Sequence, residues 1–266
     1  GVPSEMKRMW AETAVPYLKS QGWGKEIIFS RMLRFRGIGE SALATKVNHL
    51  FDMTNPTVAP YASLGEVRLR ISAKTTSEAE AMTIIEPVAQ EIIKIAGVDY
   101  FGEDKDSIAE VVGRLLGKKQ ETVSVAESCT GGGLGAMFTN IAGSSDYFWG
   151  GVIAYHNRVK MSLLGVTAEA LDNHGAVSDT VAQQMALGVK QRLGTSWGVS
   201  ITGIAGPEGG TESKPVGLVY IGIASPDGGM ESVKCTFGDR DREIIRYLSS
   251  CTALDQLRRK LIDRGI

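Results

Sequence analysis

Short apolar runs alternate with amphipathic segments through most of the chain beyond residue 106. The apolar runs predict strands, and the segments between them repeat hydrophobic positions with the helical period. Strands that alternate with helices build a sheet covered on both faces, which predicts a layered α/β/α domain. The expected strands are 122–126, 152–155, 199–202, 216–224 and 232–237, and the main expected helices are 107–116, 134–141, 179–193 and 242–261.

A different pattern precedes residue 103. Residues 66–72 alternate strictly between apolar and polar side chains, which predicts a half-buried strand. A strand-like stretch from Lys25, a helix over 40–50, a helix over 77–96 and a last strand over 98–102 complete a smaller α+β unit. Pro87 lies inside the second helix, so we expect a kink or a break there.

The first residues predict one more helix, because Ser4 is a suitable N-cap and Pro16 should end or bend the helix. The chain opens at Gly1 without a methionine, so we expect a fragment of a longer protein. Charged residues 103–106 read as a linker. The predicted division is 1–24 as the tail of a preceding domain, 25–103 as the α+β unit and 104–266 as the α/β domain.

Composition narrows the classes of function. The 266 residues are 43% hydrophobic and carry a net charge of −1, so they show no electrostatic footprint for nucleic acid or an anionic membrane. The three cysteines have no CxxC spacing and cannot all pair, which favours a reducing cytoplasm and no metal site. We find neither an apolar run of membrane-spanning length nor a signal peptide.

A glycine-rich turn at 126–133 lies between a predicted strand and a predicted helix. Its glycines let the backbone approach a ligand, and the N–H groups of a helix N-terminus attract an anion. Ser128 and Thr130 add hydroxyl groups, beside Gly131 and Gly132. The spacing matches neither the Walker loop nor GxGxxG. A phosphate site and an ordinary capped turn remain equally open.

A second cluster follows the strand at 152–155, where ligands bind in open α/β sheets. We expect Asn157 to cap the next helix and Lys160 to lie at its third position, where the helix dipole lowers a lysine pKa and favours a general base. His156 is interpreted as structural. Upstream, Ser144 and Ser145 follow Gly143 and either cap a turn or supply a nucleophile. The residues alone do not choose the nucleophile among Ser128, Thr130, Ser144 and Ser145. The side chains at the strand end are Tyr155, His156, Asn157 and Lys160.

Two further segments complete the candidate chemistry. Residues 201–217 run from Thr202 and Gly203 into many glycines, which suits a loop of backbone donors for an oxyanion or a carboxamide, or a flexible connection. Arg240 and Arg242 precede the last helix, a position that suits gripping a phosphate.

In this order, the segments resemble the carboxyl-terminal domain of the CinA (competence- and damage-inducible) family, whose stand-alone versions are the nicotinamide mononucleotide deamidases. The matching runs are AESCTGG, GSS, GGVIAYHNRVK, HGAVS, TGIAGPEGG with KPVG, and GDR. The match covers Asp106 to the end. Residues 25–102 look like the family's KH-type middle domain, and the first residues look like the tail of its molybdopterin-binding-like domain.

The resemblance implies hydrolysis of the carboxamide of nicotinamide mononucleotide by a cytoplasmic homodimer without a cofactor. It implies Ser145 as nucleophile, Lys160 as base and Tyr155 as a hydrogen-bonding assistant. The rest of the implied site lies in the segments already described. Thr202 and Arg240 complete the catalytic set, and the substrate-binding set is Ser128, Thr130, Gly131, Gly132, Asn157 and Gly203.

Two other functions stay open. The first is a nucleotide-binding regulatory module that keeps the pocket without turnover. The second is RNA binding by the KH-type unit, which we disfavour because Gly37-Ile38-Gly39 lacks the GxxG spacing of an RNA-clamping loop. A spacer or dimerisation role suits that unit better.

Overall fold

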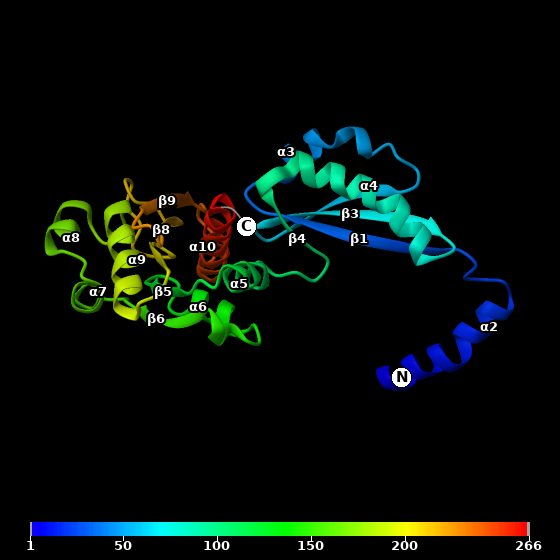
Figure 1. Ribbon diagram of the computed structural model, residues 1–266, viewed down its shortest axis with the longest axis horizontal. Coiled ribbons are helices and arrows are strands. Elements are labelled where there is room, and N and C mark those ends of the chain that lie inside the picture. Colours follow the sequence, from blue (N-terminus) through cyan, green and yellow to red (C-terminus); the bar gives the residue numbers. More distant parts are fainter. Residues whose placement is uncertain (1, 265–266) are drawn as a thin grey trace. The chain divides into compact units, whose positions relative to one another are not determined.

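The computed structural model describes residues 2–264, which form two compact units (Figure 1). The first unit ends at Lys105 and the second begins at Asp106. Among the described residues, no helix combines the length and apolarity that a membrane crossing requires.

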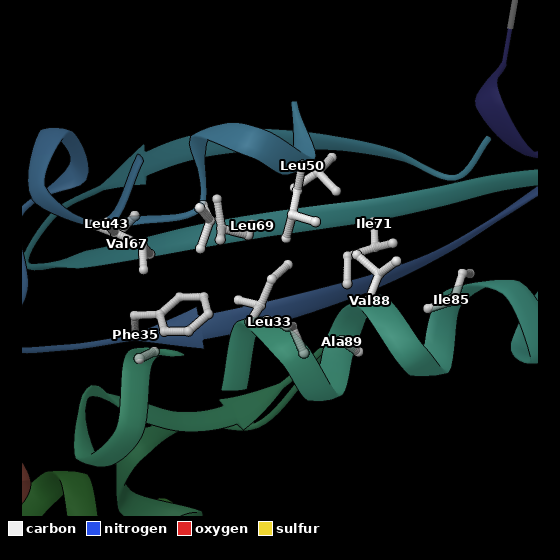
Figure 2. Close-up of a cluster of buried hydrophobic side chains, with 14 of the residues drawn as sticks. Leu33, Phe35, Leu43, Leu50, Val67, Leu69, Ile71, Ile85, Val88 and Ala89 are labelled. Atoms are coloured by element: carbon white, nitrogen blue, oxygen red, sulfur yellow. The ribbon is translucent and has the colours of Figure 1, made fainter. Parts of the chain in front are cut away.

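The first unit contains a four-stranded antiparallel sheet in the order β2-β3-β1-β4. In β3, every second residue from Val67 to Thr75 is buried, as the alternation predicts. Those side chains meet the helices over one face of the sheet in one hydrophobic core, and Figure 2 shows Ile71 beside Val88. The elements are β1 Ile27–Phe35, α3 Glu40–Lys46, η2 Asn48–Leu50, β2 Thr57–Ser63, β3 Glu66–Thr75, α4 Glu78–Ala96, η3 Gly97–Asp99 and β4 Tyr100–Glu103.

Two details of this unit correct the expectations. Strand β2 was not among the expected strands. Pro60 is tolerated in it because β2 is an edge strand that pairs only with β3. Helix α4 runs through Pro87 without a break. Ser77 caps it by accepting a hydrogen bond from the Glu80 N–H at 3.3 Å.

The opening segment is helical over α1 Pro3–Met9, a π-helical stretch η1 Trp10–Ala14 and α2 Val15–Ser20. Helix α1 begins at Pro3, so Ser4 is not its N-cap. The helix also continues past Pro16, with the wider π turn directly before it. A π turn is one way to relieve the clash between a proline ring and the preceding carbonyl groups.

The second unit is the layered α/β domain that its pattern predicts. Its five-stranded sheet has the order β6-β5-β7-β8-β9, with β6, β5 and β7 parallel and the last two strands antiparallel. The elements are α5 Ile108–Lys119, β5 Val123–Glu127, α6 Gly133–Thr139, η4 Ser144–Asp146, β6 Phe148–Ile153, α7 Asn157–Leu164, α8 Ala168–His174, α9 Asp179–Leu193, β7 Trp197–Gly203, β8 Leu218–Ala224, β9 Met230–Thr236 and α10 Arg242–Asp263.

Helix α9 covers one face of this sheet, and α10 covers the other together with α5 and α6 (Figure 1). The α9 backbone lies very close to the sheet, since a Cβ added at Gly222 would come within 2.3 Å of the Ala182 carbonyl oxygen. Glycine at this position therefore sets the distance between the two layers.

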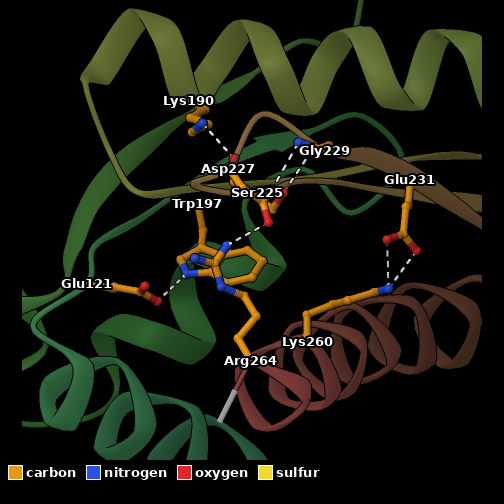
Figure 3. Close-up of polar contacts among 9 residues, drawn as sticks. All are labelled: Glu121, Lys190, Trp197, Ser225, Asp227, Gly229, Glu231, Lys260 and Arg264. Atoms are coloured by element: carbon orange, nitrogen blue, oxygen red, sulfur yellow. Dashed lines mark hydrogen bonds and ion pairs between the residues drawn. The ribbon is translucent and has the colours of Figure 1, made fainter. Parts of the chain in front are cut away.

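A polar cluster occupies the sheet end at which β7 begins (Figure 3). The buried Trp197 indole donates a hydrogen bond to the Glu121 carboxylate at 2.7 Å, and Arg264 lies over the same ring, 5.5 Å from its centroid. Lys190 donates to the Ser225 carbonyl oxygen at 2.7 Å, and Lys260 pairs with Glu231 at 2.6 Å. Charged groups at this end therefore have direct partners close to the surface.

Candidate active site

The carboxyl ends of β5, β6 and β7 meet at the opposite edge of the sheet from this cluster. The Ser128 N–H donates to the Ile201 carbonyl oxygen at 2.9 Å, and the Ala154 N–H donates to the Glu127 backbone carbonyl oxygen at 2.7 Å. These bonds tie the end of β5 to both neighbouring strands. A cavity of about 250 Å³ opens here, lined by Ser128, Cys129, Tyr155, Asn157, Lys160, Ala176, Val177, Thr202, Gly203, Ile204, Ala205, Gly206, Glu208, Gly209 and Arg242.

Lys160 supplies the buried amine of this cavity, with 1% of its surface exposed. It is the fourth residue of α7 rather than the expected third, because the N-cap is His156 and not Asn157. Its Nζ lies 3.1 Å from the Ser128 Oγ, 2.8 Å from the Ala154 carbonyl oxygen and 3.3 Å from the Tyr155 carbonyl oxygen. Burial lowers the pKa of Lys160 below its ordinary value, because desolvation disfavours the charged amine.

This set of partners suits a neutral amine that acts as a base. A neutral amine has two N–H groups and one lone pair, and the carbonyl oxygens of Ala154 and Tyr155 can only accept hydrogen bonds. The Lys160 Nζ donates to the Ser128 Oγ as well as to the two carbonyl oxygens, which satisfies the three N–H groups of an ammonium. In the neutral amine, the two N–H groups can stay on the carbonyls while the lone pair accepts from the Ser128 hydroxyl, because a hydroxyl can both donate and accept. The geometry therefore supports removal of the Ser128 proton by Lys160.

The Glu127 carboxylate occupies the N-terminus of α6, the place at which a phosphate was one expectation. Its oxygens accept the backbone N–H groups of Gly132, Leu134 and Gly135 at 2.9, 3.1 and 2.8 Å. Positive φ angles at Gly131 and Gly132 turn the chain so that these groups face the side chain. The protein's own carboxylate thus takes the anion position at this turn.

Ser145 does not lie beside Lys160. It is exposed on η4, before β6 begins, whereas Lys160 follows the end of β6. Six extended residues place the two ends of this strand roughly 15–20 Å apart. Within this chain, the serine hydroxyl beside the Lys160 amine is therefore that of Ser128 and not that of Ser145.

The arginine beside the cavity is Arg242, two residues after the expected one. Its guanidinium donates to the Gly206 carbonyl oxygen at 2.8 Å and to the Tyr155 hydroxyl at 3.2 Å. Arg240 donates from Nε to the Phe237 carbonyl oxygen and lines a neighbouring hollow instead. The start of α10 explains this difference, because Arg242 is the first residue of the helix and Arg240 lies in the loop before it.

The other expected site residues divide into two groups. Ser128, Tyr155, Asn157, Lys160, Thr202 and Gly203 line the cavity, and Thr130, Gly131 and Gly132 do not. Thr202 is 1% exposed, and its hydroxyl donates to the Ala176 carbonyl oxygen at 2.8 Å. The Thr130 side chain is fully buried behind the turn. His156 has a structural role, since its Nδ1 accepts the Arg158 N–H at 3.1 Å.

Sequence reasoning missed two residues at the site. Cys129 lines the cavity next to Ser128, and burial raises the pKa of its thiol to about 11, so it stays protonated at neutral pH. Arg246 donates to the Thr130 carbonyl oxygen at 2.7 Å and fastens the turn from α10. The spacing of four residues between Arg242 and Arg246 places both on one helix face and was the available signal.

Nothing within residues 2–264 gathers three or more His, Cys, Asp or Glu side chains in a group that could hold a metal ion. The cavity instead presents polar side chains and backbone to a ligand. They are the hydroxyls of Ser128, Tyr155 and Thr202, the Cys129 thiol, the Asn157 amide, the Glu208 carboxylate, the Lys160 amine, the Arg242 guanidinium and the backbone of residues 203–206.

The fold and the site define a layered α/β unit that carries a serine–lysine pair, preceded by an antiparallel unit with helices on one face. The CinA C-terminal domain matches residues 105–261, and the damage-inducible protein CinA KH domain matches residues 30–102. The chain therefore belongs to the CinA family.

Relatives of the whole chain carry the same family name. The chain is 83% identical over 262 residues to a CinA-like protein of Crocosphaera subtropica and 72% identical over 265 residues to one of Rippkaea orientalis. These matches cover 98% and 99% of this chain, which spans only 63% and 64% of the length of the two relatives.

Solved structures resemble part of the chain. A competence/damage inducible protein from Agrobacterium tumefaciens is 39% identical with a TM-score of 0.54, covering 57% of this chain and 94% of that one. A CinA superfamily protein from Klebsiella pneumoniae is 30% identical with a TM-score of 0.56, covering 59% of this chain and 99% of that one.

Proposed function

We propose that the second unit hydrolyses the carboxamide of nicotinamide mononucleotide to nicotinic acid mononucleotide and ammonia. The observation that carries the proposal is the contact between the Ser128 hydroxyl and a buried amine whose other two partners are carbonyl oxygens. Membership of the CinA family supports the substrate class, and Ser128 takes the place of Ser145 as the nucleophile.

The reaction begins when the neutral Lys160 amine takes the Ser128 proton and the serine oxygen attacks the carboxamide carbon. The ammonium of Lys160 then gives this proton to the leaving nitrogen, so that ammonia departs and an ester on Ser128 remains. A water molecule loses a proton to Lys160 and its oxygen attacks the ester carbon. The bond to the serine oxygen then breaks, Lys160 gives its proton to that oxygen, and the product acid leaves and ionises to the carboxylate.

Arg242 is the group in this cavity that suits the phosphate of a mononucleotide, because a guanidinium binds phosphate oxygens in a bidentate manner. Its present partners are a carbonyl oxygen and the hydroxyl of Tyr155, whose side chain is 63% exposed. An incoming phosphate can replace both of these partners.

The resemblance to the family also implies a homodimer. The proposal therefore includes a homodimer, and light scattering on the purified chain tests it.

Ammonia release from nicotinamide mononucleotide tests the proposal, with Ser128→Ala compared with Ser145→Ala. We expect Ser128→Ala to lower kcat by at least about 10³-fold, the scale on which loss of a nucleophile acts. The exposed Ser145→Ala should stay within about twofold of the wild-type chain.

Turnover in Ser128→Ala at the wild-type rate, or an equal loss in Ser145→Ala, would contradict the assignment of the nucleophile. Calorimetry on the same preparations distinguishes the regulatory alternative. Nicotinamide mononucleotide that binds to the wild-type chain without ammonia release would favour a binding module.

A further inference from the structure

Two motifs take no direct part in the proposed reaction, HGAVS at residues 174–178 and KPVG at residues 214–217. They meet at one side chain. The Lys214 Nζ donates to the His174 carbonyl oxygen at 2.6 Å and to the Val177 carbonyl oxygen at 2.8 Å. The segment between these two carbonyls, residues 174–177, is called the 174–177 turn below.

Every carbonyl group of the 174–177 turn accepts a hydrogen bond from a side chain. Besides the two from Lys214, the Ser178 hydroxyl donates to the Gly175 oxygen at 2.9 Å and the Thr202 hydroxyl donates to the Ala176 oxygen at 2.8 Å. Four successive peptide groups are therefore oriented by side chains rather than by a regular helix or strand.

This turn forms one wall of the cavity through Ala176 and Val177, whereas Lys214 is not among the lining residues. Lys214 starts from an ordered position, because its N–H donates to the Thr211 hydroxyl at 3.0 Å and its carbonyl oxygen accepts the Thr211 N–H at 2.8 Å. A Cβ added at Gly175 would lie 3.0 Å from the Lys214 amine, so the amine fits closely under the turn.

We propose that Lys214 is a positioning residue. It holds the 174–177 turn in place as one wall of the active site and makes no contact with the substrate itself. This inference rests on the proposed function for its catalytic consequence. Bonds from an ammonium to carbonyl oxygens are stronger than neutral ones, and one amine serves both ends of the turn. Without it, Ala176 and Val177 lose their fixed distance from Ser128.

The test compares Lys214→Met with Lys190→Met and Lys214→Arg in the full chain. Lys190 is the matched control, because its amine also donates to a backbone carbonyl, that of Ser225 at 2.7 Å, at the other end of the sheet (Figure 3). Lys214→Met should accelerate amide hydrogen exchange in a peptide that covers residues 174–178, and Lys190→Met should leave that peptide unchanged.

Lys214→Met should also lower kcat/KM for nicotinamide mononucleotide by about 10–100-fold, because displacing a wall by about 1 Å can cost 100-fold. Lys214→Arg keeps donors for both carbonyls and should recover most of the lost activity. Lys190→Met should retain wild-type kcat/KM.

Unchanged exchange at 174–178 in Lys214→Met would overturn the inference, whatever the activity. A loss of thermal stability equal to that of Lys190→Met, with wild-type kcat/KM, would also overturn it, because the role would then be structural only. Absence of ammonia release by the wild-type chain would instead contradict the proposed function, while the exchange experiment still reports on the turn.

Discussion

Lysines at the two ends of the second unit's sheet have different surroundings. At the end where β7 starts, Lys260 pairs with Glu231, and their side chains are 32% and 62% exposed (Figure 3). At the end where β7 finishes, Lys160 is 1% exposed, and its amine contacts one hydroxyl and two carbonyl oxygens. A carboxylate partner stabilises the charged amine, whereas burial beside neutral oxygens favours its loss of a proton.

The carboxylates show the same contrast. Glu121 accepts a single indole N–H from Trp197, whereas the buried Glu127 accepts three backbone N–H groups and lies one residue before Ser128. Because Glu127 is held by the N-terminus of α6, it is directed away from pairing with Lys160. The fold thus keeps a buried carboxylate next to Ser128 in the sequence and a buried amine 3.1 Å from its hydroxyl, and gives each of them other partners.

The largest expected effect comes from removing the buried amine. Lys160→Met should lower kcat by about 10³-fold, within the range attributed to a general base. The same change at Lys260, which belongs to an exposed pair, should leave kcat unchanged and alter the free energy of unfolding by less than about 1 kcal/mol. Ammonia release and thermal unfolding of both variants provide the measurement.

Lys160→Met should also fold at least as stably as the wild-type chain, because a thioether avoids the cost of desolvating an amine. A variant that loses activity only because it unfolds would therefore contradict the contrast between the two lysines.

The second largest expected effect concerns the free energy of unfolding and the glutamates at the two ends of the sheet, Glu127 and Glu121. Glu127→Gln keeps one acceptor oxygen but turns an amide N–H₂ toward backbone donors, which should lower the free energy of unfolding by about 2–3 kcal/mol. Glu121→Gln can still accept the Trp197 indole N–H and should cost less than about 1 kcal/mol.

Urea unfolding followed by tryptophan fluorescence measures this difference. Trp197 is fully buried, whereas Trp10, Trp23 and Trp149 are more than half exposed, so the burial of Trp197 dominates the change. Equal destabilisation by Glu127→Gln and Glu121→Gln would contradict the prediction, because it would show that the two carboxylates contribute equally to the free energy of unfolding.

The local pattern of the sequence was sufficient for most of the fold. Strict alternation located β3, and Ser107 with Glu110 forms the capping box that begins α5. The pattern did not predict β2, an edge strand that pairs only with β3 and contains Pro60.

The candidate site was predictable in its residue types but not in its pairing. Ser128 and Lys160 are 32 residues apart and meet because β5 and β6 are parallel neighbours. Carboxyl ends of parallel strands share one edge of the sheet, so a serine after β5 can reach a lysine after β6. Ser145 precedes β6, so the same rule places it at the other end of that strand within this chain.

The smallest expected effect is the dependence of rate on pH, about tenfold per pH unit along one limb. Only the neutral Lys160 can accept the serine proton, so kcat/KM should rise with pH until it passes the lowered pKa of this lysine, and level off below the ordinary lysine value of 10.5. In that window the unfolded chain binds a proton that the folded lysine has lost, so the free energy of unfolding also rises with pH. Rate profiles and urea unfolding between about pH 6 and 10, with Lys160→Met as control, measure both. A wild-type profile that stays flat, or a rise in stability that persists in Lys160→Met, would mean that the buried amine does not titrate as the comparison with Lys260 requires.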